Sequence, residues 1–156
     1  MTLAKLKEFT KAIIQCTRCP LREDATAPVP GLYILNSKYF LLGEAPGREE
    51  DKYGIPFVGQ SGRRLDKLLD IAGIDRNQCS LDNVVRCHPP ANRDPRKGEV
   101  RACIYWLYQA LRLVKPEFII TLGRIPLSLF SPYGIKAMHG TSFEIDLPEE
   151  EKVWRA

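Results

Sequence analysis

The sequence predicts an α/β fold in which a parallel sheet is covered by helices on both faces. Short apolar runs alternate with longer segments whose apolar residues recur at helical spacing, and this alternation is typical of parallel sheets. Glycine or proline ends most of these segments. The length of 156 residues is that of one domain. Because we find no linker and no internal repeat, we assign residues 1–156 to a single domain.

Helices are expected where apolar residues return every three or four positions. The first is expected over Thr2–Ile14, with Leu3, Leu6 and Phe9 on its apolar face, and Pro20 opposes its continuation. The other expected helices lie at residues 61–72, 100–114 and 127–130. Ser61 is the expected cap of the second helix, and Gly73 is its expected stop.

Strands are expected at short apolar runs, of which residues 118–122 (FIITL) are the clearest. The expected strands are residues 38–42, 81–85, 118–122 and 143–145. Long loops rich in glycine and proline follow the first two strands, at residues 44–60 and 87–97. Ligands of parallel sheets bind beyond the carboxyl ends of the strands, so these two loops are the expected functional site.

Composition excludes several classes of protein. No run approaches the roughly 18 apolar residues of a membrane-spanning helix, and the N-terminal segment carries charges where a secretory signal is apolar. The net charge of +4 permits nucleic acid as a partner without requiring it. Five cysteines in a chain without an export signal indicate metal or redox chemistry rather than a disulfide framework.

The cysteine spacing predicts a metal centre. Cys16 and Cys19 are separated by two residues, which lets both thiolates face one metal. Cys87 and Cys103 could complete a set of four, although their spacing alone does not decide this. Four thiolates suit either a tetrahedral zinc ion or an iron–sulfur cluster. Cys79 stands apart and is interpreted as an ordinary small apolar residue.

The loop after the first strand begins with Gly43-Glu-Ala-Pro-Gly47 and is rich in carboxylates. It lacks the phosphate-binding GxxxxGK[ST] pattern, and Glu44, Glu50 and Asp51 would repel a phosphate. Carboxylates at such a turn fit the activation of a water molecule or the stabilisation of a developing cation. A solvated acidic turn is the alternative.

Three motifs, in this order, resemble the family 4 uracil-DNA glycosylases, the iron–sulfur type of bacteria and archaea. They are GEAPGREED at residues 43–51, GxPFVGQSG at 54–62 and NVVRCHPPANRDP at 83–95. The C-x2-C … C-x15-C arrangement also matches this family, and the resemblance runs from about residue 6 to residue 140. It implies a three-layer α/β/α fold with a central four-stranded parallel sheet. It also implies a structural [4Fe–4S] cluster on Cys16, Cys19, Cys87 and Cys103.

The resemblance implies that the chain hydrolyses the N-glycosidic bond of uracil in DNA for base excision repair. Such an enzyme must flip the nucleotide out of the stack, after which an aromatic ring can stack on the base. An Asn amide can donate to a uracil carbonyl and accept from N3–H. The implied catalytic residues are Glu44, Glu50 and Asp51, and the implied uracil-binding residues are Ala45, Phe57 and Asn83.

Basic residues near these motifs are expected to contact DNA phosphates, which position a protein without reading sequence. The candidates are Arg63, Arg86, Arg93 and Arg96. The expected partner is uracil-containing DNA, single- or double-stranded, with no membrane involved. The expected location is the cytoplasm, and the protein is expected to be encoded by a prokaryote or by a phage.

A further motif of the family is a His-Pro segment, expected after a strand near residues 152–154. It is not found before Ala156. In the family this motif stabilises the negative charge on the departing uracil. Three interpretations follow: a truncated chain, an active site completed by a partner, or an inactive relative. His139 is interpreted as a surface histidine and Glu149–Glu151 as a solvated turn. The alternative functions are a non-catalytic iron–sulfur DNA-binding domain and a zinc-bound structural domain.

Overall fold

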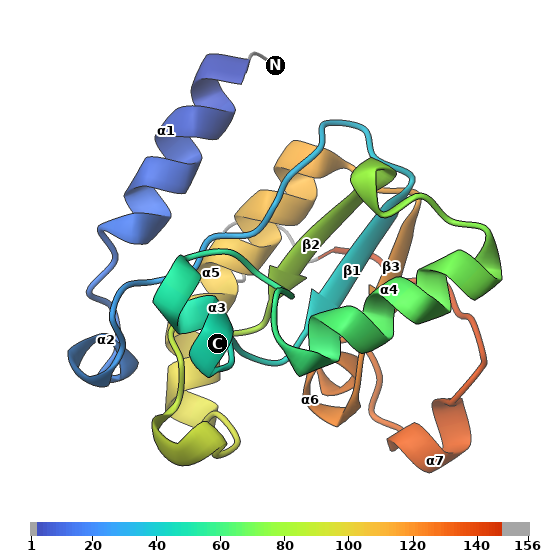
Figure 1. The fold of residues 1–156 in the computed structure, drawn as a ribbon. Coiled ribbons are helices and arrows are strands. Elements are labelled where there is room, and N and C mark those ends of the chain that lie inside the picture. Colours follow the sequence, from blue (N-terminus) through green and yellow to red (C-terminus); the bar gives the residue numbers. More distant parts are fainter. Residues whose placement is uncertain (1–2, 148–156) are drawn as a thin grey trace.

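The computed structural model describes residues 3–147 and contains one parallel sheet of three strands (Figure 1). The strands are β1 (Tyr39–Gly43), β2 (Cys79–Asn83) and β3 (Phe118–Thr121), in the spatial order β2-β1-β3. Both neighbours run parallel to the central strand β1. The carboxyl ends of all three strands therefore meet at one edge of the sheet.

Helices cover both faces of the sheet, which confirms the α/β class (Figure 1). α4 (Gln60–Ala72) covers one face and α5 (Lys97–Val114) covers the other. Successive side chains of a strand point to opposite faces. Leu41 accordingly packs in the cluster with the leucines of α4, while Phe40 and Leu42 pack in the cluster with the leucines of α5.

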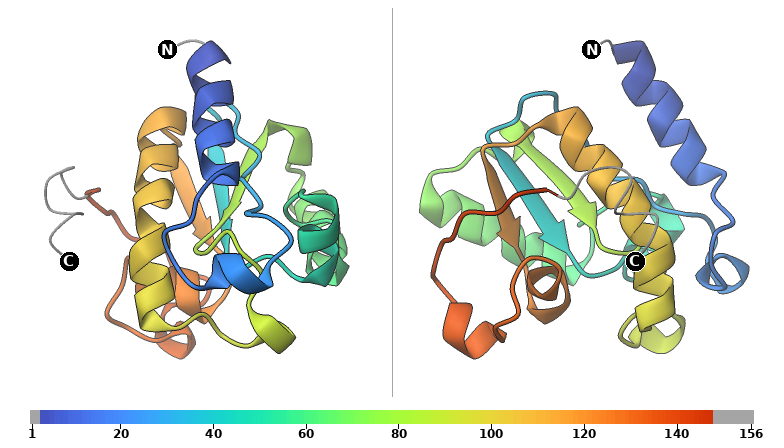
Figure 2. Two further views of the ribbon diagram at one scale, coloured as in Figure 1. Left: turned by 90° about the vertical axis from the view of Figure 1, so that its left-hand side faces the viewer. Right: turned by 180° about the vertical axis from the view of Figure 1, so that it is seen from behind.

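Shorter helices complete the described part of the chain. They are α1 (Leu3–Ile14), α2 (Leu21–Asp24), α3 (Arg48–Tyr53), α6 (Arg124–Ser128) and α7 (Ile135–Met138), with the 3-10 turns η1 (Arg76–Gln78) and η2 (Pro90–Asn92). α1 lies beside α5 (Figure 2), where the ring of Phe9 contacts Tyr33 and Trp106. In the described part of the chain, no helix combines the length and the apolar character needed to cross a bilayer.

The expected four-stranded sheet is wrong for residues 3–147, where only three strands form. Residues 143–145 have no strand pairing. β2 begins and ends two residues earlier than expected. The parallel hydrogen bonds nevertheless continue past Asn83, because the amides of Val84 and Val85 donate to the carbonyls of Gly43 and Glu44. The strand expected near residues 152–154 and the turn at 149–151 lie outside the described residues.

The loop expected at residues 44–60 contains the helix α3. Gly47 is its N-cap, and the Glu50 side chain accepts a hydrogen bond from the Gly47 amide (2.9 Å). The short helix was hidden in the sequence because glycine and proline flank it on both sides. The cap of α4 is Gly59 rather than the expected Ser61, whereas Gly73 does end that helix, with φ 66°.

Candidate functional site

Phe57 and Asn83, the residues expected to bind uracil, meet at the carboxyl end of the sheet. Gly43 and Asn83 end β1 and β2 and are register partners. A Cβ atom built on Gly43 would lie 2.6 Å from Asn83 Oδ1 and 2.6 Å from Phe57 Cζ. The aromatic ring and the amide therefore lie against the same glycine, and any side chain at position 43 would push them away.

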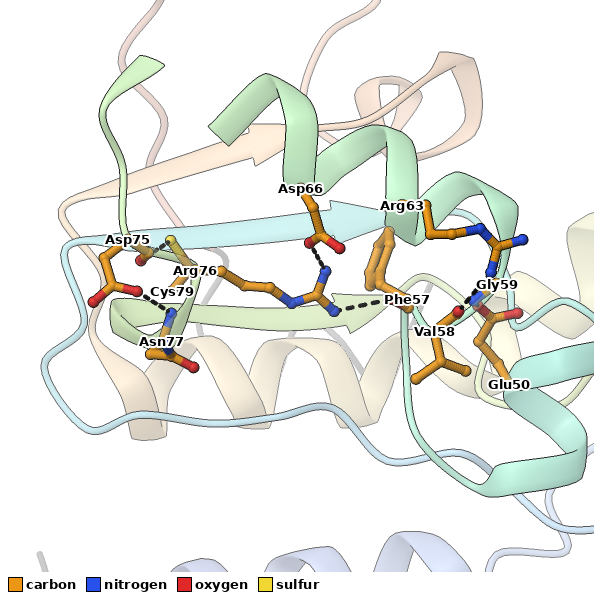
Figure 3. Close-up of polar contacts among 10 residues, drawn as sticks. All are labelled: Glu50, Phe57, Val58, Gly59, Arg63, Asp66, Asp75, Arg76, Asn77 and Cys79. Carbon is orange, nitrogen blue, oxygen red and sulfur yellow. Dashed lines mark hydrogen bonds and ion pairs between the residues drawn. The ribbon is translucent and has the colours of Figure 1, made fainter. Parts of the chain in front are cut away.

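The backbone of Phe57 has φ 56°, in the left-handed region that residues other than glycine rarely adopt. Its carbonyl accepts a hydrogen bond from Arg76 Nη2 (2.9 Å), as Figure 3 shows. The same carbonyl lies directly over Gly62, where a Cβ atom would come within 1.9 Å of it. Nothing in the local sequence around Arg76 indicates this contact, because Arg76 follows an exposed turn and reads as a solvated cation.

Glu50, one of the expected catalytic residues, joins two parts of the fold. Its carboxylate is 7% exposed and accepts hydrogen bonds from the amides of Gly47 (2.9 Å) and Gly59 (2.7 Å). Figure 3 shows Glu50 reaching Gly59 from α3. Because each carboxylate oxygen accepts a hydrogen bond from a backbone amide, Glu50 joins the two glycine-rich segments.

The Asp51 side chain also forms hydrogen bonds that link two parts of the fold. Its carboxylate accepts hydrogen bonds from the Thr26 amide (3.0 Å) and the Thr26 hydroxyl (2.7 Å). This side chain therefore ties α3 to the segment that follows α2. The expectation that Asp51 positions a water molecule stays a prediction.

Glu44 is the candidate carboxylate that remains available. It follows Gly43 directly and is half-buried, and its side chain forms no hydrogen bond or ion pair with the other described residues. Burial raises the pKa of Glu44; Asp94 raises it further and Arg124 opposes the rise. Ala45 beside it packs against the core cluster of α5.

Four cysteines line one pocket between α1, α2, β2 and α5. They are Cys16, Cys19, Cys87 and Cys103, and none of them forms a disulfide. Burial and the neighbouring sulfurs raise the pKa of Cys87 to about 12. Burial also raises the pKa of Cys19 and of Cys103. Cys79 lies away from this pocket, buried on β2 in the cluster beneath α4, as expected for a small apolar residue.

Two donors face the sulfurs of this pocket. Trp106 Nε1 donates to Cys16 Sγ (3.2 Å), and Arg86 Nη1 donates to Cys103 Sγ (3.8 Å). One feature of the sequence could have indicated that Trp106 lies near the cysteines. Cys103 and Trp106 are three residues apart on one helix and so share a face. Within residues 3–147, no three His, Cys, Asp or Glu side chains gather closely enough to hold a single metal ion.

The expectation that Arg86 contacts DNA is wrong, because Arg86 is 1% exposed. Its guanidinium forms a buried ion pair with Asp82, which also accepts a hydrogen bond from the Tyr33 hydroxyl (3.0 Å). The Nε atom of Arg86 is buried without a partner among the described residues, and Arg86 lines the cysteine pocket. This arginine serves the interior of the protein.

The other candidate DNA-binding arginines differ in whether their side chains are held by ion pairs or are exposed to solvent. Arg93 forms a two-armed ion pair with Glu99 (2.9 and 2.7 Å), so it secures the loop before α5. This hydrogen bonding lowers the pKa of Glu99. The Arg63 and Arg96 side chains are exposed, and Arg63 also donates to the Val58 carbonyl (3.3 Å) (Figure 3).

The two histidines have different surroundings. His88 Nδ1 donates to the Pro46 carbonyl (2.8 Å), so the loop after Cys87 is joined to the loop after β1. This contact brings the cysteine pocket and the Phe57–Asn83 site into one connected region, and the sequence did not indicate it. His139 is exposed, as expected.

The family model described as the uracil DNA glycosylase superfamily matches residues 30–154. The chain belongs to this superfamily. The type-4 uracil-DNA glycosylase of Sulfurisphaera tokodaii is 38% identical over 96% of this chain and 70% of its own length. Those of Pyrobaculum aerophilum and Thermotoga maritima are 42% and 40% identical over 80% and 78% of this chain. The matches span 62% and 63% of the lengths of these two relatives.

The matches to the glycosylase superfamily and to its members include both the Phe57–Asn83 site and the cysteine pocket. The matched residues include all of the sheet, the Phe57–Asn83 site and the second pair of cysteines. The alignment with the Sulfurisphaera tokodaii glycosylase covers too much of this chain to omit the first pair. The Sulfurisphaera tokodaii glycosylase is therefore aligned across the cysteine pocket as well as across the site at the carboxyl end of the sheet.

Proposed function

We propose that this chain is a type-4 uracil-DNA glycosylase, which hydrolyses the bond between uracil and deoxyribose in DNA for base excision repair. The observation that carries the proposal is the meeting of the Phe57 ring and the Asn83 amide over Gly43, with Glu44 next in the chain. The family match and the type-4 relatives support the same function. Its substrate is uracil-containing DNA, single- or double-stranded, and its place is the cytoplasm.

Recognition of uracil in this proposal depends on two side chains. A flipped base stacks on the Phe57 ring, since an aromatic ring accepts any base face. The Asn83 amide then distinguishes the base by its edge, because it can donate to a uracil carbonyl while accepting from N3–H. Cytosine presents the reverse pattern at that edge and leaves the amide unsatisfied. Ala45 is the third residue proposed to bind uracil.

Glu44 is the proposed catalytic carboxylate. Cleavage of the glycosidic bond leaves positive charge on the sugar and negative charge on the departing uracil. An ionised carboxylate next to the sugar stabilises that positive charge and orients the attacking water. Glu50 and Asp51 have a supporting place in this proposal, because their oxygens already accept hydrogen bonds from backbone and threonine donors. Arg63 and Arg96 offer exposed cations for DNA phosphates.

The proposed cofactor is a [4Fe–4S] cluster bound by Cys16, Cys19, Cys87 and Cys103. The donor set fits this group: four unpaired cysteines line one pocket, and two N–H donors face their sulfurs. A zinc ion bound by the same four thiolates, at Zn–S distances of about 2.3 Å, is the alternative. When bound, the cluster supplies a rigid cross-link and no redox step. Its ligands then hold the loop after β2 next to the DNA-facing surface.

The function is tested by Asn83→Ala. Uracil release from single-stranded uracil-containing DNA is expected to fall about tenfold to a hundredfold, because base-edge recognition by a side-chain amide is worth about 1–3 kcal/mol. Asn77→Ala is the matched control, since Asn77 lies exposed on η1. Release is measured by strand cleavage at the abasic product. A wild-type protein that binds this DNA but releases no uracil would favour the non-catalytic DNA-binding alternative.

The pH dependence tests the role of Glu44. Because burial raises the pKa of Glu44, the ionised form is lost at a higher pH than for an ordinary glutamate. Uracil release by the wild type is therefore expected to fall on the acid side, beginning above the usual titration range of a carboxylate. Glu44→Gln is expected to remove this acid limb and to lower the rate about 10²–10⁴-fold. An unchanged acid limb in Glu44→Gln would assign the titration to another group.

A further inference from the structure

The segment between α3 and α4 presents Phe57 in a backbone conformation that is held from several sides. Phe57 has φ 56° without being a glycine, and such residues persist only where their surroundings determine them. The ring end, Cζ, lies against Gly43 at the end of β1. The direction of the ring therefore depends on what fixes its backbone.

Arg76 reaches this backbone from η1. One arm of its guanidinium, Nη2, donates to the Phe57 carbonyl (2.9 Å), and the other arm, Nη1, forms an ion pair with Asp66 on α4. Figure 3 shows the side chain extended between the two partners. The planar fork of arginine suits this double role, because its two arms point to partners at a fixed angle. Arg76 is 28% exposed, so the contact is partly shielded from water.

The ends of the segment are fixed independently of Arg76. The Gly59 amide donates to Glu50 on α3 (2.7 Å), and the backbone of Gly62 lies against the Phe57 carbonyl. Arg76 therefore supplies the one side-chain hydrogen bond to the Phe57 backbone among the described residues, while Glu50 holds the loop two residues later.

We propose that Arg76 is a positioning residue that holds the Phe57 ring in the orientation required to stack on the flipped base. This inference rests on the proposed function. Arg76 acts through Phe57 and does not touch the substrate. The Asp66 carboxylate in turn orients the guanidinium. A preorganised platform binds the base without first losing conformational freedom, so removal of Arg76 weakens binding more than it slows bond cleavage.

The test is a double-variant cycle with Arg76→Met and Phe57→Ala, measured as kcat and KM for uracil release from single-stranded DNA. Arg76→Met alone is expected to raise KM about fivefold to tenfold, within the effect of losing one stacked base, and to change kcat less than about twofold. In the Phe57→Ala background, Arg76→Met is expected to change neither, because contacting residues give non-additive effects. Arg64→Met, an exposed arginine of the same helix as Asp66, is the control and is expected to leave KM unchanged.

Additive effects of the two substitutions would overturn the proposal, because Arg76 would then act independently of Phe57. Should Arg76→Met fail to fold, Asp66→Asn takes its place in the cycle, since it frees the guanidinium without removing it. Asp66→Asn is expected to raise KM by less than the roughly fivefold to tenfold expected from full loss of the Arg76 contact, and again only when Phe57 is present. A wild-type protein that releases no uracil would instead overturn the proposed function, so the two failures are distinguishable.

Discussion

Cys87→Ser is expected to deprive the anaerobically purified protein of iron and sulfide, whereas Cys79→Ser is expected to retain both. Cys87 lines the pocket shared by the four cysteines, while Cys79 is buried on β2 beneath α4. The pocket gathers chain segments that follow α1, precede α2, follow β2 and lie within α5. Loss of a metal group that joins such segments belongs to the most destabilising class of changes, about 4 kcal/mol or more.

The measurements are iron and sulfide content, visible absorbance near roughly 400 nm for an iron–sulfur centre, and the thermal midpoint of each variant. The Cys87→Ser and Cys79→Ser variants carry the same chemical change, so a difference between them reports the position and not the loss of a thiol. A colourless wild type with one zinc ion per chain would support the zinc-bound structural domain. Equal iron content in the two variants would exclude Cys87 from the ligands.

Arg86→Met is expected to reduce the free energy of unfolding by about 3–5 kcal/mol, because it leaves the Asp82 carboxylate buried without its cation. Both side chains are 1% exposed. The Tyr33 hydroxyl and the backbone N–H of Asn83 would remain as hydrogen-bond donors to Asp82, but neither carries charge. Urea unfolding of the variant, with iron content measured on the same sample, separates loss of the ion pair from loss of the cluster.

The loss of stability in Arg86→Met, measured as the decrease in the free energy of unfolding, is expected to depend on pH. Burial raises the pKa of Asp82, and Arg86 is the strongest influence that opposes this rise. Without Arg86, the folded protein holds the Asp82 proton more tightly than the unfolded chain does, so stability falls as pH rises. The deficit should therefore be largest at neutral pH and smaller in acid. The double variant Asp82→Asn/Arg86→Met should recover much of the loss, and a deficit independent of pH would contradict this account.

Local patterns predicted the framework of the fold well. The helices at residues 61–72 and 100–114 and the strands at 38–42 and 118–122 correspond to α4, α5, β1 and β3 within a few residues. Their periodicity and their glycine or proline stops depend only on near neighbours. The prediction failed at α3, where a tie between Glu50 and two glycine amides stabilises a short helix inside a glycine-rich loop.

The chemistry of individual side chains could not be predicted in the same way. Glu44, Glu50 and Asp51 look equivalent as carboxylates of one loop, yet Asp51 is occupied by Thr26, 25 residues away. Arg86 and Arg96 look equivalent as cations beside Cys87, yet Arg86 is withdrawn into the interior by Asp82. The role of each side chain depends on a hydrogen-bond or ion-pair partner that is distant in the sequence, or on burial that the sequence does not show.

The amino-acid sequence by itself determined that this is an α/β protein with motifs of the uracil-DNA glycosylases and with a cysteine spacing suited to a metal centre. Those features are written in residue order and in spacings that need no neighbour from elsewhere. Only the tertiary structure decided that the Glu44 side chain has no partner among the described residues, that Arg86 is buried beside the cysteine pocket, and that Arg76 donates to the Phe57 carbonyl. Hydrogen bonds and burial join residues such as Phe57 and Arg76, which are 19 positions apart, and no local pattern encodes such pairs.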